Sequence, residues 1–254
     1  MSKTLRIASW NIAGSRKMKS LDHFDYEEED VTYFSDQIKN ISPDIVCLQE
    51  THTNTSRAIA TEIAREIGFE FVYNCPISTS HIDSRYRLGM AVLSKVDLKG
   101  NDVTNYPYPD FPLFFKDGRP AAVHQKGVQI LMYDNLTIAN TQMLPLPVFG
   151  KTYEEDEGAV LAQKIDELLS TIMKQPLIFC GDFNFDEPQV IYPKTYKAYG
   201  LEDALPDTLT RPNKEELKKR PDHILYSSDI VCTGAKVVTV QADHYLCYAD
   251  FLYN

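Results

Sequence analysis

Residues 181–186 (Gly-Asp-Phe-Asn-Phe-Asp) carry a carboxylate and an amide at a spacing that suits phosphate chemistry. They follow the unbroken apolar run at 176–180, which is typical of a strand covered on both faces. Side chains alternate along a strand, so Asp182 and Asn184 should point the same way. The carboxylate could hold a divalent cation or take a proton from water, and the amide could donate to a phosphate oxygen. Gly, Asp and Asn also favour turns, so the segment alone is equally consistent with a turn.

Polar residues stand at the ends of several other predicted strands. Since these strands are otherwise apolar, the pattern indicates one rim where polar groups converge. Glu50 and an Asp could hold Mg²⁺ or Mn²⁺ through oxygen. A histidine beside carboxylates could be held protonated against a phosphate. The polar residues at these ends are Asn11, Glu50, Asn140, Gln142, Asp222, Asp243 and His244.

The elements that must position this rim are short strands and three amphipathic helices. Apolar residues recur at helical spacing near residues 28–40, 56–67 and 157–173. Residues 12–27 and 187–221 are predicted to be mostly loop. With no internal repeat or linker, we expect a single domain over residues 1–254. Strands are predicted at 4–11, 44–50, 69–73, 89–93, 127–133, 136–140, 176–180, 222–226 and 236–240, with one more at the end of the chain.

Two apolar loops, at residues 105–115 and 143–149, are rich in proline and large side chains. Proline at every second or third position excludes a central strand. Burial is the commonest fate of phenylalanine. The loops could otherwise stack on bases or dip into a membrane interface. The sequence leaves these alternatives open.

The composition favours a cytoplasmic, monomeric protein with one substantial core. Of 254 residues, 43% are hydrophobic, and neither a membrane-spanning run nor a signal-peptide pattern is visible. The five scattered cysteines predict neither a zinc site nor a disulfide framework. The net charge of −10 disfavours loose attraction to nucleic acid, although a bound cation would reverse the local sign. The basic residues at 214–220 alternate with glutamates and predict a solvated helical turn.

The order of the motifs resembles that of the endonuclease/exonuclease/phosphatase superfamily over residues 5–250. The resemblance implies a four-layered α/β sandwich, with two mixed β-sheets packed face to face and helices outside. It also implies a metal-dependent hydrolase of phosphoester bonds. The motifs are Ser9-Trp10-Asn11, Leu48-Gln49-Glu50, Gly181-Asp182-Phe183-Asn184, Arg220-Pro221-Asp222-His223-Ile224 and Ala242-Asp243-His244.

The resemblance also implies a role for each rim residue. Glu50 is similar to the main metal ligand, with Asn11 and Asp243 close to the Mg²⁺ or Mn²⁺ ion. Asp182 resembles the group that orients or deprotonates the attacking water, and Asn184 the amide that grips the scissile phosphate. Asp222 resembles the partner that sets the tautomer of the catalytic His244. Asn140 and Gln142 are expected to contact the substrate.

Gln142 departs from the family pattern, because many members have histidine at this position. Glutamine can donate a hydrogen bond to phosphate but carries no charge. The other histidines lack acidic partners at recognisable spacing. His23, His52, His81 and His124 are therefore expected to be surface or core residues, and His223 should face away from Asp222.

The function expected first is a phosphodiesterase acting on nucleic acid, that is, a nuclease. The alternative is a phosphatase acting on a small-molecule or lipid-borne phosphate. A more distant alternative is a non-catalytic binding module of the same fold. The motifs do not distinguish DNA from RNA, or endonuclease from exonuclease action.

Overall fold

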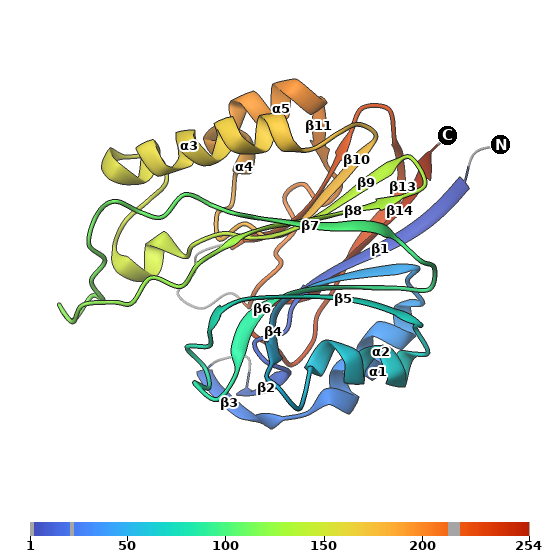
Figure 1. The fold of residues 1–254 in the computed structure, drawn as a ribbon, viewed down its shortest axis with the longest axis horizontal. Helices are drawn as coiled ribbons and strands as arrows, with labels where there is room; N and C mark the ends of the chain where they lie inside the picture. The colour runs from blue at the N-terminus through green and yellow to red at the C-terminus, as the bar shows by residue number, and fades with distance from the viewer. Residues whose placement is uncertain (1–2, 21–22, 213–218, 254) are drawn as a thin grey trace.

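The computed structural model describes residues 3–20, 23–212 and 219–253. Two six-stranded mixed sheets pack face to face, and helices cover their outer faces (Figure 1). The predicted four-layered α/β sandwich is therefore confirmed. The basic segment at 214–220 lies largely outside the described residues. None of the helices that the structure describes is long and apolar enough to cross a membrane.

The first sheet has the strand order β13-β14-β1-β4-β6-β5. Its central strand β1 runs parallel to β4 and antiparallel to β14, so the two ends of the chain share one sheet. Helices α1 (Val31–Ile41) and α2 (Ile59–Ile67) cover its outer face. The strands are β1 (Lys3–Asn11), β4 (Ile45–Thr53), β5 (Phe71–Thr79), β6 (Arg87–Ser94), β13 (Val231–Val238) and β14 (Leu246–Tyr253).

The second sheet has the order β11-β12-β10-β9-β8-β7. Its outer face is covered by α3, α4 and α5, which lie along the upper edge of Figure 1. The helices are α3 (Asp156–Ile172), α4 (Pro188–Ile191) and α5 (Pro193–Tyr199), with a 3₁₀ turn η1 (Leu146–Phe149). The strands are β7 (Lys99–Asn105), β8 (Gly127–Tyr133), β9 (Leu136–Gln142), β10 (Leu177–Asp182), β11 (Leu201–Asp203) and β12 (Asp222–Ser227).

Apolar side chains from both sheets fill the space between them. Cys47 of β4 and Cys180 of β10 are fully buried there, and all five cysteines are free, as predicted. Trp10 lies on the other face of the first sheet, where its ring packs 4.6 Å from that of Phe34. Its indole Nε1–H donates to the carbonyl of His244 at 2.9 Å, so a core residue anchors the loop before β14.

Part of the region predicted as loop, residues 12–27, forms a two-stranded ribbon. The ribbon consists of β2 (Arg16–Ser20) and β3 (His23–Glu29), and the side chain of Met18 in β2 is buried. Helix α1 begins three residues later than predicted, because Asp30 caps it by accepting a hydrogen bond from Tyr33 N–H at 2.9 Å. The ribbon depends on contacts distant in sequence, including Met18 N–H to the Gln241 carbonyl, and such contacts leave no local pattern.

Candidate active site

The ends of the central strands of both sheets meet at one edge of the sandwich. In the first sheet, parallel β1 and β4 end close to Asn11 and Glu50. In the second sheet, parallel β9 and β10 pair Gln142 with Asp182, and antiparallel β12 places Asp222 opposite Asp182. Five of the residues predicted to share a rim therefore come together, each from a different strand: Asn11, Glu50, Gln142, Asp182 and Asp222.

Asp182 is the hydrogen-bonded centre of this rim. The side-chain amide of Asn11 donates to its Oδ2 at 2.9 Å, which links the two sheets. Asn184 donates to the same oxygen at 3.1 Å and, through its backbone N–H, to Oδ1 at 3.0 Å. Gln142 Nε2 lies 3.5 Å from Oδ2. These contacts fix the orientation of a carboxylate that is 1% exposed.

The environment of Asp182 favours a carboxylate that can accept a proton. Burial raises the pKa of Asp182, and the positive charge of His244 opposes that rise. The neighbouring charges of Asp222 and Glu50 raise the pKa further, and the net direction is upward. A carboxylate with a raised pKa is a stronger base than a solvated one, which suits a group that takes a proton from water.

The backbone around Asp182 explains the glycine before it. Gly181 has φ of 146°, and a Cβ there would lie 2.0 Å from the carbonyl oxygen of Thr141 on the adjacent strand. Asn184 is also left-handed, with φ of 50°. The strand therefore ends in a sharp turn that only glycine can begin, and this turn aims Asp182 and Asn184 at the same edge.

His244 and Asp222 form a buried pair beside Asp182. The imidazole Nδ1 lies 2.8 Å and 3.0 Å from the two carboxylate oxygens of Asp222. Burial opposes the charged imidazolium, but the charges of Asp222 and Asp182 outweigh it and raise the pKa of His244 to about 9. The pair therefore holds His244 protonated at neutral pH, with Nε2 free of hydrogen bonds to any described residue.

Glu50 lies on the opposite sheet and contacts the residue that departs from the family pattern. Gln142 Nε2 donates to Glu50 Oε1 at 2.6 Å, across the two sheets. Burial acts to raise the pKa of Glu50, but the charges of Lys126 and His81 and the Gln142 hydrogen bond lower it overall. Glu50 is therefore ionised at neutral pH, as a metal ligand must be.

Asn184 was predicted to grip the substrate phosphate through its amide. The structure uses both amide hydrogens within the protein, because Nδ2 also donates to the Met143 carbonyl at 2.9 Å. A phosphate oxygen would have to replace one of these two bonds. Asn184 nevertheless faces the pocket described below.

Asp243, predicted to lie close to the metal, is held by protein groups instead. Arg211 donates to both of its oxygens at 2.6 and 2.7 Å, and the Tyr26 hydroxyl donates to Oδ2 at 2.9 Å. Burial raises the pKa of Asp243, but His244, Arg211 and these hydrogen bonds lower it overall. Asp243 thus lines the pocket as one half of a fork-shaped ion pair.

Asn140, predicted to contact the substrate, lies in the interior between the sheets. Its Oδ1 accepts from Gln49 Nε2 at 2.7 Å, and its Nδ2 donates to the carbonyls of Leu48 and Ala91 at 3.0 and 3.2 Å. The side chain is fully buried and does not line the pocket. This placement contradicts a substrate-binding role and gives Asn140 a structural one, because its amide joins β9 to β4 and β6.

Two sets of residues could hold a metal ion. Asp182, Asp222 and His244 each offer one ligand atom, and these atoms lie within 4.8 Å of one another. The set predicted from the sequence was Glu50, Asn11 and Asp243. Of that set, Glu50 Oε2 receives no hydrogen bond from a described residue. Asn11 Oδ1 accepts from Ala13 N–H at 3.1 Å.

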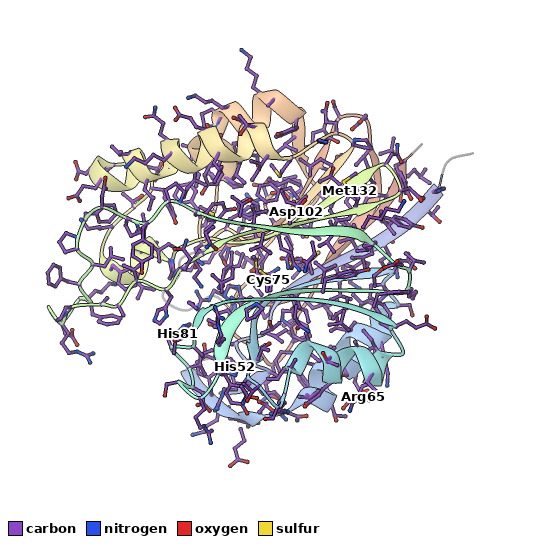
Figure 2. The ribbon with its side chains drawn as sticks, in the orientation of Figure 1. His52, Arg65, Cys75, His81, Asp102 and Met132 are labelled. Atoms are coloured by element: carbon purple, nitrogen blue, oxygen red, sulfur yellow. The ribbon has the colours of Figure 1, made fainter. Side chains whose placement is uncertain are left out.

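A pocket of about 700 Å³ is lined by Asn11, Glu50, Asp182, Asp243 and His244, and also by basic residues absent from the predicted site. His81 and His124, predicted to be surface or core residues, lie at the pocket with their rings 5.4 Å apart. Figure 2 shows His81 on the side of the molecule where the long β7–β8 loop lies. None of these basic residues belongs to a recognisable motif; they are Arg16, His81, His124, Lys126 and Arg211.

One wall of the pocket is apolar and comes mostly from the two apolar loops, with Ile82 and Ala122 from outside them. Tyr106, Phe111 and Leu113 of the first loop are buried, as the commonest fate of such residues predicts. Phe115 remains 37% exposed, and its ring packs 5.7 Å from that of Phe149 in the second loop. The wall consists of Ile82, Phe115, Ala122, Leu144, Pro145, Val148 and Phe149.

Comparison with known proteins agrees with this fold. The model of the endonuclease/exonuclease/phosphatase family matches residues 8–244. A DNA-(apurinic or apyrimidinic site) endonuclease of Dictyostelium discoideum is 27% identical over 198 residues, which cover 76% of this chain. They cover 46% of that relative, so the chain matches about half of its length.

Solved structures show the same architecture at low sequence identity. An endonuclease/exonuclease/phosphatase from Beutenbergia cavernae superposes with a TM-score of 0.75 at 13% identity, covering 99% of this chain and 72% of the other. A family protein from Leptotrichia buccalis gives a TM-score of 0.67 at 15% identity, covering 97% and 99%. Because the family model matches residues 8–244 of the chain, the chain belongs to the endonuclease/exonuclease/phosphatase family.

Proposed function

We propose that the protein is a divalent-metal-dependent phosphodiesterase whose substrates are nucleic acids or their fragments. The observation that carries the proposal is the arrangement around Asp182. A buried carboxylate with a raised pKa, a protonated histidine and an ionised glutamate face one pocket. Together they provide a base, a cationic donor and an oxygen ligand, which are the groups that phosphoester hydrolysis needs.

In this proposal Asp182 acts on the attacking water and His244 acts on the phosphoryl group. Asp182 orients the attacking water and accepts its proton, and its raised pKa favours that transfer. His244, held protonated by Asp222, donates from Nε2 to a phosphoryl oxygen and stabilises the negative charge of the transition state. Asn184 holds a second phosphoryl oxygen after exchanging one of its protein hydrogen bonds.

The donor set fits Mg²⁺ or Mn²⁺, with Glu50 as the principal ligand. Carboxylate oxygens are the ligands these ions prefer. The group of Asp182, Asp222 and His244 is the poorer candidate, because His244 Nδ1 is already directed at Asp222 and a protonated imidazole cannot bind a metal. A bound cation would neutralise charge on the phosphoryl oxygens.

The pocket favours a substrate that combines a phosphate with a flat apolar group. Phe115 and Phe149 provide an aromatic surface beside the polar rim, and bases stack on such surfaces. The similarity to an endonuclease acting at abasic sites supports nucleic acid as the substrate. The net charge of −10 argues against broad electrostatic contact with a long duplex. We therefore propose short or single-stranded substrates before duplex DNA.

A phosphatase acting on a small or lipid-borne phosphate is the second candidate. The same apolar wall could hold the organic part of a phosphate monoester. The two candidates differ in the bond cleaved, and substrate tests with defined products can separate them.

The deciding experiment incubates the purified protein with single-stranded DNA, DNA containing an abasic site, RNA and phosphate monoesters. Each reaction is run with Mg²⁺, with Mn²⁺ and with excess chelator. We expect cleavage of a phosphodiester that requires the metal and disappears in His244→Asn. Hydrolysis of monoesters alone would support the phosphatase, and binding of nucleic acid without turnover would support a binding module. Full turnover in chelator would contradict the metal requirement.

A further inference from the structure

Lys126 occupies a position at the active site that the motifs do not reveal. It is the residue before Gly127, the first residue of β8, and Gly127 pairs with Gln142 in the antiparallel β8–β9 ladder. Lys126 therefore stands one residue from the cross-strand partner of the glutamine that replaces the usual histidine. Its side chain lines the same pocket as Glu50 and Asp182.

Close contacts fix the backbone at Lys126. Its carbonyl accepts from Tyr106 N–H at 2.9 Å and from Gln125 Nε2 at 2.9 Å. At Gly127, a Cβ would lie 2.4 Å from the Thr104 carbonyl, so β7 packs directly against this point. The lysine is thus held by close contacts and does not lie on a free loop tip.

The Lys126 side chain is largely buried, and its ammonium group at the pocket has no close partner among the described residues. Lys126 is 8% exposed, yet no described residue forms a hydrogen bond or ion pair with Nζ. Burial lowers the pKa of Lys126, while the charges of Glu50 and Asp182 act to raise it. A largely buried lysine whose charge lacks a close partner is costly for the folded state, so its presence at the pocket points to a ligand that is anionic.

The other charged groups of the pocket also favour an anionic ligand at Lys126. Arg211 is committed to Asp243, and Gln142 is neutral and bonded to Glu50. His244 is directed at Asp222. Arg16 and Lys126 also line the pocket. The Lys126 ammonium forms no ion pair with a described carboxylate, although the charges of Glu50 and Asp182 act on it.

We propose that Lys126 binds an oxygen of the scissile phosphate and supplies the positive charge that Gln142 cannot. This proposal rests on the proposed phosphoesterase function and names a residue of the same site. Lysine acts on phosphate as a point charge with three donors, so it needs no fixed fork geometry.

The test compares Lys126→Met, Lys126→Arg and the control Lys116→Met. Lys116 lies exposed in the same long loop and does not line the pocket. Affinity for inorganic phosphate is measured by calorimetry at fixed Mg²⁺, together with kcat/KM on the best substrate. Removing a charge-assisted bond should weaken phosphate binding by about 10- to 100-fold in Lys126→Met. Lys126→Arg should retain most of the affinity, and the control should match the wild type.

Thermal unfolding separates a ligand-binding lysine from a structural one. Because Nζ has no partner in the protein, Lys126→Met should keep or raise the Tm of the ligand-free protein. A lower Tm with unchanged phosphate affinity would overturn the proposal and make Lys126 a structural counter-ion of Glu50.

A double variant tests directly whether Lys126 supplies the positive charge that Gln142 lacks. Gln142→His placed in the Lys126→Met protein should recover part of the lost phosphate affinity, since it returns a cation to the same edge. If the phosphate affinity does not recover, Lys126 does not stand in for the charge missing at Gln142.

The proposal and the proposed function can fail separately. If His244→Asn abolishes turnover while Lys126→Met binds phosphate and turns over normally, the lysine proposal is wrong and the function stands. If phosphate binding depends on Lys126 but no substrate is hydrolysed, the lysine proposal stands and the function is wrong.

Discussion

The described residues include two histidine–aspartate pairs, one buried and one partly buried, that use neighbouring residues of one strand. His244 pairs with Asp222, and His223 pairs with Asp203, each at a shortest N–O distance of 2.8 Å. Asp222 and His223 are consecutive in β12, so strand alternation sends their side chains to opposite sides. One pair faces the pocket and the other lies behind it.

The pairs differ in what the second imidazole nitrogen contacts. His223 Nε2 lies 3.0 Å from the Phe185 carbonyl, so both of its ring nitrogens are used within the protein. His244 Nε2 receives no partner from the described residues. A pair with no free nitrogen stabilises the fold, whereas a pair with one nitrogen directed at a pocket can act on a ligand. The chemical composition of the pair does not distinguish these roles.

The largest expected effect comes from replacing the two histidines separately. His244→Asn should lower kcat by about 10²- to 10⁴-fold, because it removes a positioned cationic donor. Asparagine retains a donor toward Asp222, which limits the loss of stability. His223→Asn should leave kcat close to wild type. Steady-state kinetics on the best substrate measure both; equal losses would mean that the comparison is wrong.

The second test moves the pH at which His244 loses its proton. His244 acts in its protonated form, so wild-type activity should fall as pH rises through about 9. Asp222 raises that pKa, and Asp222→Asn should therefore move the alkaline decline to lower pH, by about 1–3 units. The pH profile of kcat measures this shift. Asp203→Asn, the matched change in the other pair, should leave the profile in place.

A third test measures stability. The pair that matters less for kcat, His223 with Asp203, should matter more for the free energy of unfolding. His223→Ala should lower the free energy of unfolding by about 1–3 kcal/mol, because Asp203 and the Phe185 carbonyl both lose a buried partner. Chemical denaturation gives the value. Unchanged stability together with reduced kcat would assign His223 to catalysis.

The smallest expected effect is on the acid sensitivity of folding. Burial raises the pKa of Asp203, but His223, the Leu205 N–H and Arg220 lower it overall. A depressed native pKa contributes stability that is present above the unfolded value of about 3.9 and is lost as pH falls through the native value. The stability of Asp203→Asn should therefore change less between pH 7 and acid than that of the wild type.

The control for this comparison is Asp102→Asn. Asp102 is exposed on β7 and is labelled in Figure 2. Its replacement should leave the acid dependence of the unfolding free energy unchanged. A change as large as that of Asp203→Asn would show that general charge, and not the His223–Asp203 pair, sets the acid sensitivity.

The sequence by itself determined the central strands of both sheets, the helices α1, α2 and α3, and the polar residues at the strand ends. It did not predict β2, β3, β7 and β11, or the short helices α4 and α5 in the region predicted to be mostly loop. Apolar runs followed by Asn11, Glu50 and Asp182 predicted a common edge, and the structure brings those residues together. The alternation rule also predicted correctly that His223 faces away from Asp222. These features follow from periodicity along one strand, which is local information.

Tertiary structure alone decided which polar residues reach the pocket. Asn140 belongs to the same strand-end pattern as Gln142, two residues before it, yet it lies between the sheets and bonds to Gln49. Asp243 is held by Arg211, 32 residues away in the chain, and Lys126 reaches the site from a loop without a motif. The register of one sheet against the other sets these contacts, and no short stretch of sequence encodes it.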